Sequence, residues 1–275
     1  MKASIGISRL LTSAALLGVV ATGVTRPAHA SALPPPTPAT MAGLGSLDHG
    51  GVFAPVIAPM SQDQLVAHAR RLDAYKAAVA QHAAQTNAVP NGDPGGFGGL
   101  SGAVNVTAYA EPNSVPYRNY CGPGASQVLI SNWTSNVPSI DTLASQEQTD
   151  PNGKTLFGNM VGPLNTAVNS TFYGEVSASS QGVFNGYIGA DIYNSHRPLM
   201  TAIHTIGNGQ TLNGWTVAAD HILTIFGFDF RVAGAGTISY VETAGSVAGT
   251  TSTGYNSFGA DPFWTLVLLN NGQIW

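Results

Sequence analysis

Cys121 is the one cysteine of the 275-residue chain, and it opens the segment Cys121-Gly122-Pro123. Proline is favoured in the first turn of a helix, because its missing N–H has no intrahelical partner to lose. Apolar residues then recur at helical spacing, so a buried helix is predicted over residues 120–133. A cysteine at the start of such a helix lies beside the positive end of the helix dipole, which favours the nucleophilic thiolate. Gly122, which has no Cβ, is predicted to let a substrate backbone approach.

A thiolate nucleophile needs a base that later protonates the leaving group, and imidazole suits both tasks. His221 opens an apolar run and is predicted to stand at the mouth of a strand over residues 221–230. His204 lies inside a predicted strand over residues 199–206 and is interpreted as a core histidine, while His196 precedes Arg197-Pro198 and is interpreted as a loop residue. Cys121 and His221 are therefore the candidate nucleophile and general base, and they must meet at a solvent-open groove.

The pattern around these two residues resembles a known family. Tyr-Cys-Gly-Pro is followed about 100 residues later by the His221 strand, and then by a hairpin into Tyr240-Val241-Glu242. This resembles the bacteriocin-processing type of papain-like cysteine peptidase, in a secreted stand-alone form, over roughly residues 110–275. The resemblance implies an α+β fold in which the nucleophile-bearing central helix packs on an antiparallel β-sheet. It also implies hydrolysis of peptide or amide bonds through a Cys-His-acid triad and a thioester, without a cofactor.

The acid of the triad and the oxyanion donor both depart from the family pattern. The family commonly has Asp where this chain has Glu242, which is one methylene longer; Asp229 and Asp261 are further candidates for the acid. The family usually supplies a Gln several residues before the cysteine, but residues 113–120 contain none. Asn119 and Asn113 could offer the same amide, and loss of one oxyanion donor costs about 100- to 1,000-fold in rate.

The first 30 residues predict export. A basic start, an apolar stretch over residues 10–24 and then Ala28-His29-Ala30 indicate a secretory signal peptide cleaved near Ala30. The mature protein is expected to be extracellular, with no membrane span. Residues 31–102 are rich in Pro, Gly and Ala and are interpreted as a linker or pro-region with one helix over residues 61–85, which either docks on the domain or is a solvated spacer. Residues 103–275 are predicted to form the peptidase-like domain, with further strands over 237–241 and 263–269.

Composition limits the partners. Charged residues make up 9 % of the chain, where about 25 % is usual, and the formal net charge is −4. Such a chain has no basic patch for nucleic acid, and no closely spaced cluster of His, Cys, Asp and Glu predicts a metal site. The predicted partner is a peptide or protein substrate. Two other functions stay open: a catalytically weak or inactive binding module of the same fold, and an amidase or transglutaminase-like acyl transferase.

Overall fold

The computed structural model describes residues 60–86, 99–112, 120–150, 154–206, 212, 215, 218–232, 234–244, 253–270 and 272–275. The helices in these ranges are α2 (Gln62–Thr86), α3 (Cys121–Ser131), α4 (Ile140–Gln146), α5 (Phe157–Ala167), α6 (Gln181–Gly189), the π-helix η2 (Ala190–Ser195) and α7 (Ala260–Leu268). The strands are β1 (Ser101–Ala103), β2 (Glu175–Val176), β3 (Leu199–Ile206), β4 (Ala218–Asp229), β5 (Thr237–Glu242), β6 (Gly254–Gly259) and β7 (Gln273–Ile274). The fold is α+β, as the sequence predicts.

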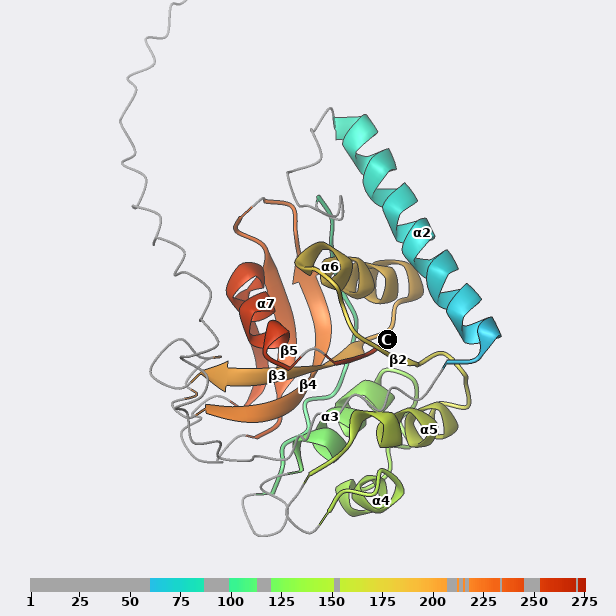
Figure 1. The fold of residues 1–275 in the computed structure, drawn as a ribbon, viewed down its shortest axis with the longest axis vertical. Coiled ribbons are helices and arrows are strands. Elements are labelled where there is room, and N and C mark those ends of the chain that lie inside the picture. Colours follow the sequence, from blue (N-terminus) through green and yellow to red (C-terminus); the bar gives the residue numbers. More distant parts are fainter. Residues whose placement is uncertain are drawn as a thin grey trace, which may run out of the picture. The chain divides into compact units, whose positions relative to one another are not determined.

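The strands of the described ranges form one antiparallel sheet (Figure 1). Their order is β2-β7-β3-β4-β5-β6, and β1 pairs with β4. Strand β4 is central: it pairs with β3 along the whole of β3, and with β5 on its other side. The β4–β5 register shifts between Ile225 and Gly227, an irregularity that bends a strand locally. This arrangement places β4, which carries His221, beside β5, which ends at Glu242.

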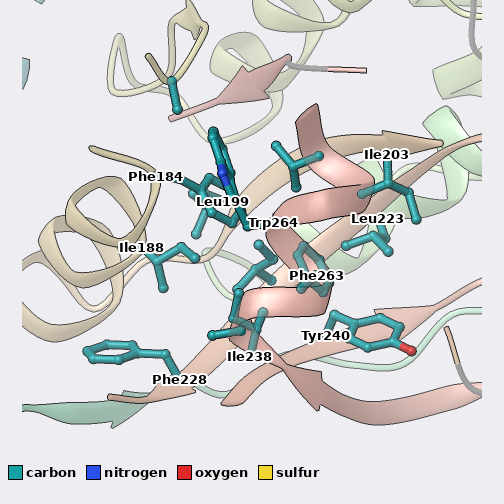
Figure 2. Close-up of a cluster of buried hydrophobic side chains, with 14 of the residues drawn as sticks. Phe184, Ile188, Leu199, Ile203, Leu223, Phe228, Ile238, Tyr240, Phe263 and Trp264 are labelled. Atoms are coloured by element: carbon teal, nitrogen blue, oxygen red, sulfur yellow. The ribbon is translucent and has the colours of Figure 1, made fainter. Parts of the chain in front are cut away.

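The sheet buries apolar side chains on both faces, because successive side chains of a strand point to opposite sides. Leu223 and Ile225 of β4 belong to a large cluster with residues of α2, α6 and α7. Figure 2 shows part of this cluster, with Phe263 and Trp264 of α7 among the strand residues. Ile222, which directly precedes Leu223 and so points to the opposite face, belongs to a second cluster formed mainly with α3 and α5. Helices therefore cover the sheet on both sides.

Helix α3 packs directly on the sheet. It begins at Cys121, and every residue from there to Ile130 is buried. The Thr224 hydroxyl of β4 donates a hydrogen bond to the backbone oxygen of Ala125 at 2.7 Å. This bond satisfies both buried groups and ties the helix to the strand. The segment predicted as a helix over residues 120–133 is thus an inner element of the fold.

The prediction of a strand over residues 263–269 is wrong, because this segment lies in helix α7. A short apolar run fits a buried helix as well as a buried strand. The helix signal stood just before the run, where Asp261 and Pro262 occupy the first turn, positions that favour acidic residues and proline. Phe263 and Leu266 then pack into the large cluster at helical spacing.

Helix α2 docks on the rest of the described chain. It begins with a reciprocal cap: the Ser61 hydroxyl accepts from the Gln64 N–H at 3.2 Å, and Gln64 Oε1 accepts from the Ser61 N–H at 3.0 Å. Tyr75 and Val79 are buried in the large cluster, and α2 runs beside α6 and η2 (Figure 1). Helix α2 is therefore packed on the described domain, while the assignment of residues 31–102 to a linker or pro-region stays a prediction. The predicted boundary between residues 102 and 103 falls inside β1.

Among the described residues, no helix has the combined length and apolarity that crossing a membrane requires. The predicted signal peptide, residues 1–30, lies outside the described residues.

Candidate active site

Cys121 occupies the first position of helix α3. The Gly124 N–H donates to the Tyr120 carbonyl oxygen at 2.8 Å, which closes the first turn around the cysteine. A negative charge at this end of a helix is stabilised by the helix dipole. The local geometry is therefore the one that the Gly-Pro sequence predicts, and it suits a thiolate.

Three side chains from three elements meet at this point. His221 of β4 is hydrogen-bonded to the Cys121 sulfur. Its Nε2–H donates to Glu242 Oε1 of β5 at 2.8 Å, which leaves Nδ1 as the ring nitrogen for the sulfur. The order thiol, imidazole and carboxylate is that of a nucleophile, a base and a group that orients the base.

The Glu242 carboxylate is held by further donors. The Ala244 backbone N–H donates to Oε1 at 2.9 Å, and the Trp215 Nε1–H donates to Oε2 at 2.9 Å. Both carboxylate oxygens are therefore bonded in a site where Glu242 is only 2 % exposed. A buried carboxylate needs such donors, because burial without them would favour its neutral form.

The charges of the pair reinforce each other. Burial alone would lower the pKa of His221, but the Glu242 carboxylate and then the hydrogen bond to Cys121 raise it well above the ordinary 6.5. Burial alone would raise the pKa of Glu242, but the His221 charge and hydrogen bond, with the Ala244 and Trp215 donors, lower it below the ordinary 4.5. The charged form of His221 is therefore favoured between the Glu242 carboxylate and the Cys121 sulfur.

Trp215 is a member of the site that the sequence analysis missed. Besides its bond to Glu242, its ring lies 4.8 Å, centroid to centroid, from the His221 ring. It is 1 % exposed, and a buried indole N–H generally has an acceptor. That requirement is the signal that could have linked Trp215 to an acid of the site.

The other candidate residues lie elsewhere. The partly exposed Asp229 pairs with Arg231 at 2.6 Å, and Asp261 accepts from Gln181 Nε2 at 2.7 Å on the surface. His204 is not the core histidine expected from the sequence: its side chain is 23 % exposed and pairs with Asp220 at 2.7 Å. The predicted oxyanion residues Asn119 and Asn113 lie outside the described residues.

The expectation of a solvent-open groove is not met. Cys121 is 2 % exposed and His221 1 % exposed. Gly122 faces the chain's own Thr155 and not a free groove: a Cβ at Gly122 would lie 2.8 Å from Thr155 Oγ1. The Cys121 sulfur is therefore nearly inaccessible to solvent in this structure. The periodicity of apolar residues predicts which face of an element is buried, but it does not predict which side chains cover the Cys121 sulfur.

No group of three or more His, Cys, Asp and Glu side chains that could hold a metal ion occurs among the described residues. No family model and no curated protein matches the chain, so the resemblance to bacteriocin-processing peptidases gains no support there. Among solved structures, the chain is similar to a recombinant stem bromelain precursor, with 10 % identity, a TM-score of 0.37 and coverage of 79 % of this chain and 93 % of that one. A likeness of this size carries no assignment of fold or activity.

Replacing Glu242 by Gln should lower the free energy of unfolding by about 3–5 kcal/mol near pH 6, the usual cost of removing one partner of a buried ion pair. The raised pKa of His221 means that its contribution is complete below about pH 6.5 and is lost as pH rises through the folded value. The lowered pKa of Glu242 means that its contribution is present above about pH 4.5 and is lost as pH falls through the folded value. The difference in the free energy of unfolding between wild type and Glu242→Gln should therefore be largest between about pH 4.5 and pH 6.5.

Urea denaturation from pH 4 to pH 9 measures this difference, with Glu147→Gln as the matched control. Burial raises the pKa of Glu147 to about 8, so its carboxyl is mainly protonated at pH 7. Gln replaces a protonated Glu with the same shape and no lost charge, and should cost less than about 1 kcal/mol. Equal losses in the two variants would contradict an ionised Glu242.

Proposed function

We propose that this chain is a papain-like cysteine hydrolase that acts on peptide or amide bonds. The observation that carries the proposal is the hydrogen-bonded series from Cys121 at the start of a buried helix, through His221, to Glu242. The type of each residue, its order in the series and the directions in which the pKa values of His221 and Glu242 are shifted suit nucleophilic acyl transfer.

The reaction follows from these positions. The Cys121 thiolate attacks the carbonyl carbon, and the carbonyl π electrons move to oxygen. As this intermediate collapses, the C–N bond breaks and His221 Nδ1–H protonates the leaving nitrogen, which gives a thioester. His221 then removes a proton from water, the resulting hydroxide attacks the thioester, and the C–S bond breaks to release the acid and restore the thiolate.

We extend the proposal to the substrate and the compartment. The substrate is a peptide or protein, and export rests on the Ala28-His29-Ala30 signal. N-terminal sequencing of the protein recovered from culture medium tests export, with Ser31 expected as the first residue. An amidase or transglutaminase-like transferase would use the same triad. A substrate panel that includes amides and primary amine acceptors separates these reactions.

One observation favours a second candidate, a catalytically inactive binding module of the same fold. Cys121 is nearly inaccessible and belongs to an apolar cluster with Ala125, Leu129 and Ile222. A free thiol also serves as a small apolar core residue. The two candidates differ in whether the native protein opens to admit a reagent to the sulfur.

Iodoacetamide should distinguish the candidates. In a hydrolase, the His221 side chain beside the sulfur activates it as a nucleophile. Native Cys121 should then react about tenfold faster than a cysteine peptide at pH 6, and His221→Ala should abolish that advantage. Mass spectrometry of the alkylated protein measures both rates. If Cys121 reacts only after denaturation, the protein is a catalytically inactive binding module and not a hydrolase.

A further inference from the structure

Glu111 is a buried acid close to the candidate site, and the sequence analysis did not single it out. Its backbone N–H donates to the Thr243 carbonyl oxygen at 2.7 Å. Its Oε1 accepts from the Thr243 hydroxyl at 2.9 Å. Thr243 directly follows Glu242, so two hydrogen bonds fix Glu111 to the end of the strand that supplies the acid of the triad.

The Glu111 carboxyl group also lies against the first turn of α3. Its Cγ would be 3.5 Å from a Cβ placed on Gly124, and the Tyr120 backbone N–H lies close enough to bias its ionisation. The side chain is 4 % exposed. Within the described part of the chain, Oε2 has no hydrogen-bond partner. Buried polar atoms are nearly always hydrogen-bonded, so this oxygen, beside the start of α3, is expected to form a hydrogen bond with a bound ligand.

We propose that Glu111 carries a proton on Oε2 and donates a hydrogen bond from it to the oxyanion that forms when Cys121 attacks a carbonyl group. This role rests on the proposed hydrolase function. It fills the position for which the sequence offered Asn119 or Asn113. The bond strengthens as charge develops on the substrate oxygen and weakens when the carbonyl re-forms, so Glu111 keeps its proton through the cycle.

The surroundings of Glu111 support a neutral carboxyl group. Burial raises its pKa from 4.5 to about 7, against the opposing effects of the His221 charge and the Thr243 hydrogen bond, while the Glu242 charge raises it further. Among the described residues, the titratable side chains whose charges act on Glu111 are His221 on β4 and Glu242 on β5. Two carboxyl groups in one buried site seldom ionise together, and here Glu242 holds the charge.

The test compares two reagents that attack the same sulfur. p-Nitrophenyl acetate acylates Cys121 through a tetrahedral oxyanion and releases p-nitrophenolate, whereas iodoacetamide alkylates it by displacement of iodide without an oxyanion. The ratio of the two rates isolates the oxyanion donor and cancels most of the effect of access to the site. The proteins are wild type, Glu111→Gln, whose amide donates without a titratable proton, and Glu111→Leu, which donates nothing.

The wild-type ratio should fall about tenfold per pH unit above pH 7 as Glu111 loses its proton, in line with its pKa of about 7. Glu111→Gln should keep a constant ratio to about pH 9. Below pH 7, Glu111→Leu should lower the ratio about 100- to 1,000-fold relative to wild type, with an alkylation rate within about threefold of wild type, and the difference should narrow above pH 7 as wild type loses its proton. If Glu111→Leu does not fold, the pH profiles of wild type and Glu111→Gln decide the question.

A ratio that is unchanged in Glu111→Leu, or that falls above pH 7 in Glu111→Gln as it does in wild type, overturns the proposal. Hydrolysis of fluorescently labelled casein by the wild type separates this failure from failure of the hydrolase proposal. If casein is cleaved while the ratio of acylation to alkylation rates is the same in Glu111→Leu as in wild type, only the proposed role of Glu111 as an oxyanion donor fails. If the ratio depends on Glu111 but no peptide or amide turns over, the hydrolase proposal fails and the donor role stands.

Discussion

Cys121→Ala, His221→Ala and the double variant should all lose hydrolysis of labelled casein to the same extent, by on the order of 10⁴-fold or more. In the proposed mechanism, His221 activates the sulfur that attacks the substrate, and its imidazole has no leaving group to protonate unless the sulfur has attacked. Once one of the two is gone, the other contributes nothing more. Initial rates for the three variants, measured at equal protein concentration, test this lack of additivity.

The chain offers a matched control for the histidine. His204 also pairs with an acid, Asp220, at 2.7 Å, and it lies on the strand next to that of His221. It differs in its exposure: the His204 side chain is 23 % exposed, and that of His221 is 1 % exposed. His204→Ala should keep activity within about threefold of wild type. Independent, multiplicative losses in the Cys121 and His221 variants, or an equal loss in His204→Ala, would contradict the proposed triad.

Tyr75→Ala should lower the free energy of unfolding by about 3–5 kcal/mol, the usual cost of deleting a buried aromatic ring. Tyr75 is 0 % exposed, and its ring fills the space beside Gly189 of α6, where any Cβ would overlap it. The ring also meets Phe228 of β4 edge to face, with centroids 6.2 Å apart. One residue thus joins α2 to a helix and to the central strand.

Urea denaturation measures this loss, and Leu65→Ala is its control on the same helix. Leu65 is 45 % exposed, so its truncation should change stability by no more than about 0.5 kcal/mol. A large loss for Tyr75→Ala alone means that α2 is a structural part of the folded unit. A loss below about 1 kcal/mol would instead favour a helix that can be removed, as in a pro-region.

Several elements could be predicted from the sequence because their signals are local. Proline after Cys121 and the apolar spacing beyond it indicate α3, and the Ser61 and Gln64 pair indicates the start of α2. The apolar run after His221 indicates β4. By contrast, the run over residues 263–269 was predicted as a strand and is a helix, since a short segment that is apolar on all sides has no period to read.

The chain by itself determined the cysteine, histidine and acid worth considering, because residue type and helix or strand context limit which side chains can do acyl transfer. Only the tertiary structure decided that Glu242 and neither Asp229 nor Asp261 meets His221, that Trp215 and Glu111 join them, and that the sulfur is covered. These facts depend on the pairing of β4 with β5 and on the packing of α3 across the sheet. Contacts between segments about 100 residues apart leave no periodicity along the chain, so they arise only when the sheet forms.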